Sequence, residues 1–370
     1  MNKKFWATAF TLTGTVVGAG ILGLPYIFSQ SGFLIGLFWL IFLGLVLTLV
    51  KLYLGEITLR TKGNHHLTGY AERYLGKWGK RFMFFAMIFG IYSALIAYLI
   101  GEGQSLSQIF TGTQNYAILF ALGFWIIMTA LLREGLKGLK KIETWGVIAI
   151  ILLIITIFIL FLPKISLSNL TYIEPSKFLL PFGVVLFALL GTSSIPELRR
   201  EIKGQEKNLK KAIIIGSVLP IVLYIIFSFT FIGVLGKDVS EIATLSFGNI
   251  INILGIFTML TSYFVLSFAL KDMFKFDYNL SKNKTFLFTS LTPLVIYFLI
   301  TIFNALGFVS VLSIGGVVAG GLAGIIIVLM NQKAKSKGNR KPEYQININK
   351  LIIVIISLIF IFGLISELFL

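Results

Sequence analysis

Residues 14–26 read GTVVGAGILGLPY and place four glycines and one proline inside the first long apolar run of the chain. In a helix interior, glycine costs about 1 kcal/mol and proline about 3 kcal/mol relative to alanine. A regular helix is therefore a poor solution for this segment. We expect the first helix to be interrupted near its middle, around residues 18–20.

The composition places this helix in a membrane. Of the 370 residues, 57% are hydrophobic and 13% are charged, whereas soluble proteins carry about 25% charged residues. Apolar runs of about 18 residues or more are typical of membrane-spanning helices. The sequence predicts an all-α polytopic membrane protein with eleven such runs, at residues 5–30, 32–58, 81–107, 116–133, 138–162, 177–202, 209–236, 247–275, 285–303, 306–331 and 348–369.

The positive charges alternate between the two ends of these helices. With the N-terminus in the cytoplasm, 28 of the 32 lysines and arginines lie at cytoplasmic ends or loops, Lys51 lies within the second helix, and only Lys164, Lys177 and Lys237 lie outside. This asymmetry is the positive-inside rule. We expect a protein of the cell membrane with a cytoplasmic N-terminus and an extracellular C-terminus.

The net charge of +17 admits a second explanation, because the basic segment KAKSKGNRK at residues 333–341 resembles a patch that binds anionic lipid or nucleic acid. The topology already accounts for most of this charge. We therefore expect membrane lipid as a partner, and neither nucleic acid nor an obligate protein partner.

A second interruption lies five helices after the first. Residues 182–202 read FGVVLFALLGTSSIPELRREI, with glycine, small polar residues and proline in the middle of the sixth helix. Because five is odd, helices 1–5 and helices 6–10 must cross the membrane in opposite directions. Paired interruptions in two inverted halves indicate the binding site of a transporter.

This repeat defines the expected organisation of the chain. A single transmembrane domain covers residues 1–332, with helices 1–5 at 5–162 and helices 6–10 at 177–331. A basic cytoplasmic loop follows at 333–347, and an additional eleventh helix occupies 348–370.

The two interruptions differ in their chemistry. Ser194 and Glu197 have the spacing of a capping box, which would satisfy the first backbone N–H groups of the second half of helix 6. In helix 1, Gly18, Ala19 and Gly20 offer no side-chain cap. Free N–H groups at a helix N-terminus attract an anion, so a carboxylate is the expected ligand. The alternative is that these glycines only allow close helix packing.

Several segments resemble a known family. GAGILGLPY (18–26), YAERYLGKWGK (70–80), YSALIAYLIGEGQSL (92–106), LFALLGTSSIPEL (186–198) and TSYFVLSFALKDMF (261–274) are similar, in order, to signatures of the amino acid/auxin permeases and their aromatic amino acid permease relatives. These belong to the amino acid, polyamine and organocation superfamily. The resemblance implies a LeuT-like fold of two inverted five-helix repeats with broken helices 1 and 6.

The resemblance also implies a substrate site. The N–H groups of residues 18–20 would hold the substrate carboxylate, carbonyl groups at both breaks would receive its ammonium group, and Phe187 would close over the substrate. Phe187 and Tyr92 are equally compatible with ordinary helix packing. The expected substrate-binding residues are Thr15, Val16, Gly18, Ala19, Gly20, Tyr92, Phe187, Gly191, Thr192 and Ser193.

A coupling ion is the only cofactor that the resemblance implies. Sodium-driven members of this fold bind the ion between carbonyls of helix 1 and hydroxyls of helix 8, and hard oxygen ligands suit an alkali cation. Hydroxyls in membrane helices also bond carbonyls one turn back, so Na⁺ and H⁺ both stay open. The matching positions are Gly14, Val17, Thr258, Thr261 and Ser262.

Ionisable residues inside the predicted spans are further candidates. Lys51 is expected to extend its long side chain toward the membrane surface, and Glu56 is expected to pair with Arg60 one turn later. Glu102 is expected at the outer boundary of the third helix. Each of these side chains is able to relay protons, and the sequence singles out none of them.

Other functional classes lack the residues that they need. The chain contains no cysteine, which excludes disulfides and thiolate metal sites. Its only histidines, His65 and His66, are adjacent in a cytoplasmic loop, so neither an intramembrane enzyme nor a transition-metal site is expected. No continuous polar stripe suggests a channel. We expect a symporter of L-amino acids, neutral or aromatic, that works by alternating access; a transporter of another small organic solute is the alternative.

Overall fold

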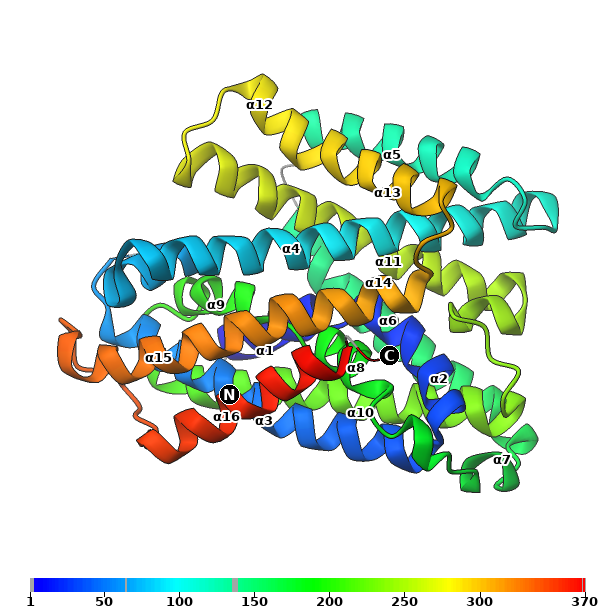
Figure 1. Ribbon diagram of the computed structural model, residues 1–370, viewed down its shortest axis with the longest axis horizontal. Coiled ribbons are helices and arrows are strands. Elements are labelled where there is room, and N and C mark those ends of the chain that lie inside the picture. Colours follow the sequence, from blue (N-terminus) through cyan, green and yellow to red (C-terminus); the bar gives the residue numbers. More distant parts are fainter. Residues whose placement is uncertain (1–2, 64, 135–138, 368, 370) are drawn as a thin grey trace.

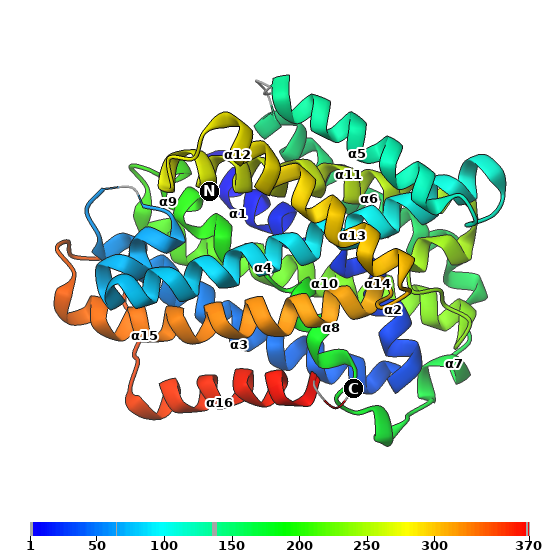
Figure 2. The same ribbon diagram turned by 45° about the horizontal axis from the view of Figure 1, so that its top comes forward.

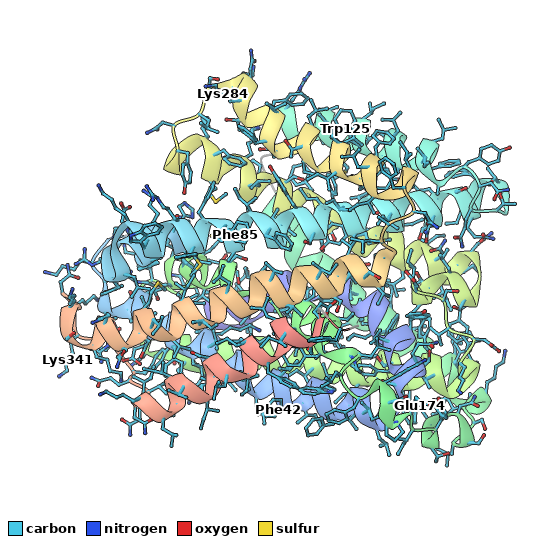
Figure 3. All side chains as sticks on the ribbon, viewed as in Figure 1. Phe42, Phe85, Trp125, Glu174, Lys284 and Lys341 are labelled. Atoms are coloured by element: carbon cyan, nitrogen blue, oxygen red, sulfur yellow. The ribbon has the colours of Figure 1, made fainter. Side chains whose placement is uncertain are left out.

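The computed structural model describes residues 3–63, 65–134, 139–367 and 369. Its described residues form helices and connecting loops, without strands. Figure 1 shows the longest helices running roughly side by side along one axis of the molecule. Basic Lys341 and acidic Glu174 lie toward opposite ends of this axis (Figure 3). The elements therefore run across the molecule as expected for a bundle of membrane spans.

The first helix is interrupted as the glycine-rich segment predicts. α1 (Lys3–Val16) and α2 (Gly20–Ser31) are bent by 54° relative to each other. The sixth predicted helix is also divided, into α8 (Pro181–Ala188), the short 3₁₀ turn η3 (Thr192–Ser194) and α9 (Ile195–Glu201).

The other predicted spans form helices close to their expected bounds. They are α3 (Phe33–Arg60), α4 (Leu67–Thr111), α5 (Ala117–Glu134), α6 (Leu139–Phe161), α10 (Leu209–Leu235), α11 (Asn249–Asp272), α12 (Lys282–Phe286) with α13 (Thr292–Ile302), α14 (Phe308–Gly315) with α15 (Gly321–Lys337), and α16 (Lys350–Glu367). Short π-helical turns join α12 to α13 (η7, Leu287–Leu291) and α14 to α15 (η8, Gly316–Gly320). Two short pieces, α7 (Ser168–Thr171) and η5 (Ala243–Phe247), lie in loops.

The number of spans stays a prediction. By length and composition, nine helices of the described residues are able to cross a membrane, or ten if the bent pair α1 and α2 counts as one span. The predicted span outside this count is the fourth, at 116–133, which corresponds to α5 and has a shorter apolar part than the others.

α4 is longer than predicted. Its 45 residues join the expected cytoplasmic helix at 70–80 to the third span, with a break in helical backbone geometry at Gly76. α4 lies within the bundle, where it contacts α5, α11, α14 and α15. Small residues such as Ala94 and Ala97 are fully covered there. α4 is therefore positioned to form a wall of a cavity inside the bundle.

The basic loop after α15 packs against the end of α3. The Tyr344 hydroxyl donates to the Leu52 carbonyl at 2.7 Å, and the Ile346 N–H donates to the buried Glu56 carboxylate at 3.0 Å. α16 then returns along α15 at the edge of the molecule (Figure 2). The loop is thus an ordered part of the structure that holds α3 and α15 together.

Candidate functional site

The break in helix 1 leaves backbone donors without backbone partners. The Val17 N–H still donates to the Thr13 carbonyl at 2.8 Å, and the Leu22 N–H donates to the Ala19 carbonyl at 3.0 Å. In the described part of the chain, the N–H groups of residues 18–20 donate to no backbone carbonyl, and Ala19 provides no side-chain cap. This end of α2 therefore has hydrogen-bonding groups that the backbone does not satisfy, together with the positive end of a helix dipole.

The break in helix 6 satisfies itself differently, and the predicted capping box is wrong at Ser194. The Ser194 hydroxyl donates to the Gly191 carbonyl at 2.9 Å and makes no cap to the first turn of α9. The reason is that Ser194 has helical backbone angles (φ −81°, ψ −20°) within a 3₁₀ turn, whereas a capping residue needs an extended backbone. Gly191 begins this turn with a φ of +152°, which favours glycine.

The two breaks cross in direct contact. A Cβ atom placed on Gly20 would lie 2.4 Å from the Cα atom of Ala188, so the start of α2 touches the end of α8 backbone to backbone. A Cβ atom on Gly191 would lie 2.7 Å from a methyl group of Val16. The close approach of the two broken helices therefore requires glycine at these positions.

Tyr224 of α10 links the same two helix ends. Its hydroxyl lies 2.8 Å from the Val16 carbonyl and 2.9 Å from the Ala188 carbonyl, and these residues end α1 and α8. Tyr224 is fully buried. The sequence analysis missed this residue, because a single tyrosine in an apolar helix carries no motif.

A cavity of about 110 Å³ lies at the crossing. Its lining includes Ile91, Ala94 and Tyr98 of α4, and none of its lining side chains is charged. Nine of the ten predicted substrate-binding residues line it, namely Thr15, Val16, Gly18, Ala19, Gly20, Phe187, Gly191, Thr192 and Ser193. The structure thus brings the two interrupted segments together around one space.

The tenth predicted residue, Tyr92, lies elsewhere. Its hydroxyl donates to the Phe288 carbonyl of η7 at 2.6 Å, and Tyr92 does not line this cavity. Helical spacing explains the difference. Ile91, Ala94 and Tyr98 follow an i, i+3, i+7 pattern and share one face of α4, and Tyr92 is outside this pattern. That spacing was the signal that would have selected Tyr98.

A second cavity, of about 160 Å³, adjoins the first, and Thr15 and Tyr98 line both. Four of the five predicted ion-binding residues line it: Gly14, Val17, Thr261 and Ser262. Thr258 does not, and its hydroxyl donates to the Gly255 carbonyl at 2.8 Å. The Thr261 hydroxyl lies 3.0 Å from the Phe257 carbonyl. Both threonines thus make the bond one turn back that hydroxyls commonly make in helices.

Tyr98 stands between the two cavities. Its hydroxyl interacts with the backbone of Ala19 and with the side chain of Ser262. A Cβ atom on Gly18 would lie 2.9 Å from the Tyr98 hydroxyl and 3.3 Å from the Ser262 hydroxyl. Tyr98 therefore connects the break in helix 1 with the predicted ion-binding helix α11.

The charged residues inside the spans differ in their surroundings. The predicted pair of Glu56 and Arg60 is confirmed, with a distance of 2.8 Å. Lys51 does not reach the surface: it is 1% exposed, and its Cε atom lies 3.7 Å from the Cβ position of Gly191. Glu102 is fully buried, and neither carboxyl oxygen has a hydrogen-bond partner among the described residues. It lies one turn beyond Tyr98.

Two broken helices that cross at a small central cavity in a membrane bundle define a class of transporters. The solved structure of MhsT in complex with L-phenylalanine resembles the chain with a TM-score of 0.67, at 16% sequence identity over 98% of both chains. This similarity shows that the fold is LeuT-like, as the sequence resemblance implied.

The chain belongs to the tryptophan/tyrosine permease family, whose model matches residues 1–367. Glutamine transporter 2 of Aliivibrio fischeri is 26% identical, with 94% of both chains covered. Tyrosine-specific transport system 1 of Haemophilus influenzae is 24% identical, with 97% of this chain and 96% of the relative covered. The predictions of an amino acid permease family and of a transporter rather than an enzyme are confirmed.

Proposed function

We propose that the protein is a symporter that carries neutral or aromatic L-amino acids across the cell membrane together with Na⁺ or H⁺. The observation that carries this proposal is the set of backbone N–H groups at residues 18–20, which have no backbone partner and line a cavity. A carboxylate satisfies such donors and is favoured by the dipole of α2.

The opposite charge of an amino acid finds its complement at the same crossing. α1 and α8 both end at the Tyr224 hydroxyl, so their carbonyl groups and the negative ends of their dipoles converge there. An ammonium group placed beside Val16 and Ala188 would therefore be stabilised. Residues 18–20 and these two helix ends together favour a zwitterion over a simple anion or cation.

The substrate class follows from the rest of the lining. No charged side chain lines the cavity, and Phe187, Ile91 and Ala94 give it apolar walls. A neutral side chain fits these walls without the cost of an unpaired charge. The names of the relatives, which refer to glutamine and tyrosine, agree with a neutral or aromatic substrate.

Two sites are candidates for the coupling ion, one for Na⁺ and one for H⁺. Na⁺ would bind in the second cavity, between helix 1 carbonyls and the Thr261 and Ser262 hydroxyls. A proton would bind to Glu102, because burial of an ionised carboxylate without partners is costly and a protonated carboxyl removes that cost. Each site supplies a separate test.

Transport would proceed by alternating access, in which the central cavity opens to one side of the membrane at a time. The lining of the first cavity continues along α4 to Ala86 and Met87, toward the end of the bundle that carries the basic loops. On the other side, a Cβ atom on Gly23 of α2 would lie 3.1 Å from Leu312, so α2 packs closely against α14. With the N-terminus in the cytoplasm, this arrangement supports the assignment of an inward-facing state.

The test is a thermal-shift screen of the twenty amino acids with the purified protein. Because a ligand that binds only the native state raises its apparent stability, neutral or aromatic amino acids should raise the melting temperature. Tyramine, which is tyrosine without its carboxylate, should not. Equal shifts with tyrosine and tyramine, or no shift with any amino acid, would contradict the proposal.

A variant focuses this test on the backbone donors. Gly18→Ala places a methyl group against the Tyr98 and Ser262 side chains without a backbone clash, and it should weaken amino acid binding by about tenfold or more. Gly123→Ala on α5 is the matched control, because open space surrounds that position. The same assay in sodium and potassium buffers at two pH values, with Ser262→Ala and Glu102→Gln, separates the two ions.

A further inference from the structure

A cavity of about 650 Å³ lies away from the substrate site, at the end of the bundle that carries the basic loops. α5, α11 and α12 surround it together with η7. Figure 3 shows Trp125 of α5 and Lys284 of α12 along the upper edge of the molecule, with Lys341 of the basic loop lower down at its left end. The Trp125 indole donates to the Ser290 carbonyl of η7 at 3.0 Å, which joins the two walls.

Four basic side chains line this cavity: Lys275 of η6 (Met273–Asp277), and three from three different helices, Arg133 of α5, Lys271 of α11 and Lys282 of α12. The Lys271 ammonium donates to the Leu132 carbonyl at 2.7 Å, and the Arg133 guanidinium lies 4.7 Å from the centre of the Phe286 ring. None of the three pairs with a carboxylate of the described residues, and no acidic side chain lines the cavity. Their mutual repulsion calls for an anion.

The wall also contains an unused hydrogen-bonding group. Thr289 is 1% exposed, lines the cavity, and its hydroxyl has no hydrogen-bond partner in the described part of the chain. The neighbouring Thr129 and Ser290 hydroxyls bond to each other at 2.6 Å. A buried hydroxyl without a partner costs free energy, so Thr289 is better explained as a ligand to a group that enters the cavity.

The basic loop at 333–341 provides the contrast. Lys335 lies 3.5 Å from Glu56 and also donates to the Ile346 carbonyl. Arg340 donates to the Leu59 carbonyl and pairs with Glu343, and this pairing raises the pKa of Arg340 above its ordinary value. The loop uses these charges to hold the structure together through pairs with Glu56 and Glu343, whereas Arg133, Lys271 and Lys282 pair with no carboxylate of the described residues.

We propose that this cavity binds the phosphate group of an anionic phospholipid. Arginine, lysine and hydroxyl donors that converge from several elements suit a phosphate, and basic pockets between membrane helices on the cytoplasmic side bind lipid headgroups of this kind. Apolar Leu132, Leu280 and Phe286 line the same cavity. Leu287 of η7, the residue after Phe286, and Val295 of α13 are 42% and 47% exposed. A phospholipid satisfies both parts, and a free phosphate satisfies only one.

This inference goes beyond the proposed transport function and does not depend on it. The site lies between α5, α11 and α12, which correspond to helices 4, 8 and 9 of the predicted repeat. It is therefore outside the two broken helices. Bound lipid should therefore stabilise the protein with or without an amino acid present.

The test measures binding of phosphatidylglycerol and phosphatidylcholine to the detergent-purified full chain by native mass spectrometry and thermal shift. Phosphatidylglycerol should bind more tightly and raise the melting temperature more. The double variant Arg133→Gln/Lys282→Gln should weaken phosphatidylglycerol binding by about tenfold or more, since each basic residue near a membrane surface contributes to attraction of anionic lipid. Its matched control is Lys333→Gln/Lys341→Gln, which removes the same charge from exposed positions of the basic loop.

Three outcomes would overturn the proposal. Equal binding of the two lipids removes the anionic preference, and an equal loss in both double variants assigns the effect to overall charge. An equal stabilisation by inorganic phosphate or glycerol 3-phosphate assigns the site to a soluble ligand. Thr289→Val keeps the shape of the side chain and removes its hydroxyl, so it should fold normally and weaken phosphatidylglycerol binding about threefold.

Discussion

The two broken helices cross at one point but treat their backbone groups in opposite ways. At the helix 6 break, the 3₁₀ turn and the Ser194 hydroxyl supply bonds within the segment itself. At the helix 1 break, the N–H groups of residues 18–20 have no backbone partner in the described residues. We therefore propose that helix 1 contributes most of the hydrogen bonds to the substrate. The helix 6 break supplies the surface against which helix 1 is placed.

The comparison also separates two roles among neighbouring glycines. Close packing explains Gly20, whose Cβ position lies 2.4 Å from the Ala188 backbone. Gly18 faces side chains, and its N–H group adjoins the cavity. Close packing is therefore confirmed at Gly20, and anion binding stays a prediction for Gly18.

The largest effect is expected at the backbone contact between the breaks. Gly20→Ala would force α2 away from α8, and overpacking of this kind costs about 3 kcal/mol. We expect a much lower melting temperature and a lower yield of monodisperse protein. Gly123→Ala, in open space on α5, should stabilise its helix by up to about 1 kcal/mol. A normal melting temperature for Gly20→Ala would show that the two breaks are farther apart than described.

Loss of the shared hydroxyl should have the next largest effect. Tyr224→Phe leaves the Val16 and Ala188 carbonyls buried without this donor, at a cost of about 2 kcal/mol. Denaturant or thermal unfolding of purified protein measures this loss. Tyr297→Phe, another buried tyrosine away from both breaks, serves as a control for removal of a hydroxyl. A fall no larger than that of the control would contradict a role for Tyr224 at the crossing.

Ser194 distinguishes a turn from a helix cap. As a donor to the Gly191 carbonyl, Ser194 should tolerate Thr and lose about 1 kcal/mol on replacement by ionised Asp, which cannot donate. An N-cap would give the opposite order, because Asp is as good a cap as Ser. The melting temperatures of Ser194→Thr and Ser194→Asp decide between them. A Ser194→Asp protein as stable as the unmodified protein would restore the capping box.

The smallest effect on stability is expected at Tyr98. Tyr98→Phe removes a hydroxyl that interacts with Ala19 and Ser262 at the edge of two cavities. We expect a change in unfolding free energy below about 1 kcal/mol and a clear loss of amino acid affinity by isothermal titration. Unchanged affinity would remove Tyr98 from the site and leave the break in helix 1 as the sole contributor.

Much of the fold followed from local patterns in the sequence. Long apolar runs identified the helices, and glycine-rich segments identified both breaks, because these signals depend on residues close together in the chain. The cap at Ser194 was predicted wrongly, since the same S-x-x-E pattern is compatible with a 3₁₀ turn when the serine backbone is helical. Sequence pattern alone does not specify that angle.

The residues that the sequence did not reveal act through contacts between distant helices. Tyr98 and Tyr224 lie on α4 and α10, and each reaches the break in helix 1 only after the bundle has formed. The helical face shared with Ala94 would have favoured Tyr98 over Tyr92. Tyr224 has no comparable signal, because its partners are carbonyl groups that every residue possesses.

The Tyr224 hydroxyl has one further consequence. The hydroxyl has one hydrogen atom to donate, and two carbonyl oxygens, from helices 1 and 6, lie within hydrogen-bonding distance of it. If one half-helix rotated alone, its carbonyl would move away and the hydroxyl would hydrogen-bond only the carbonyl of the other helix. If both rotated together, the hydroxyl would stay within bonding distance of both carbonyls. This hydroxyl therefore links the two breaks. Concerted movement of helices 1 and 6 should cost less free energy than movement of either helix alone, because it keeps both contacts.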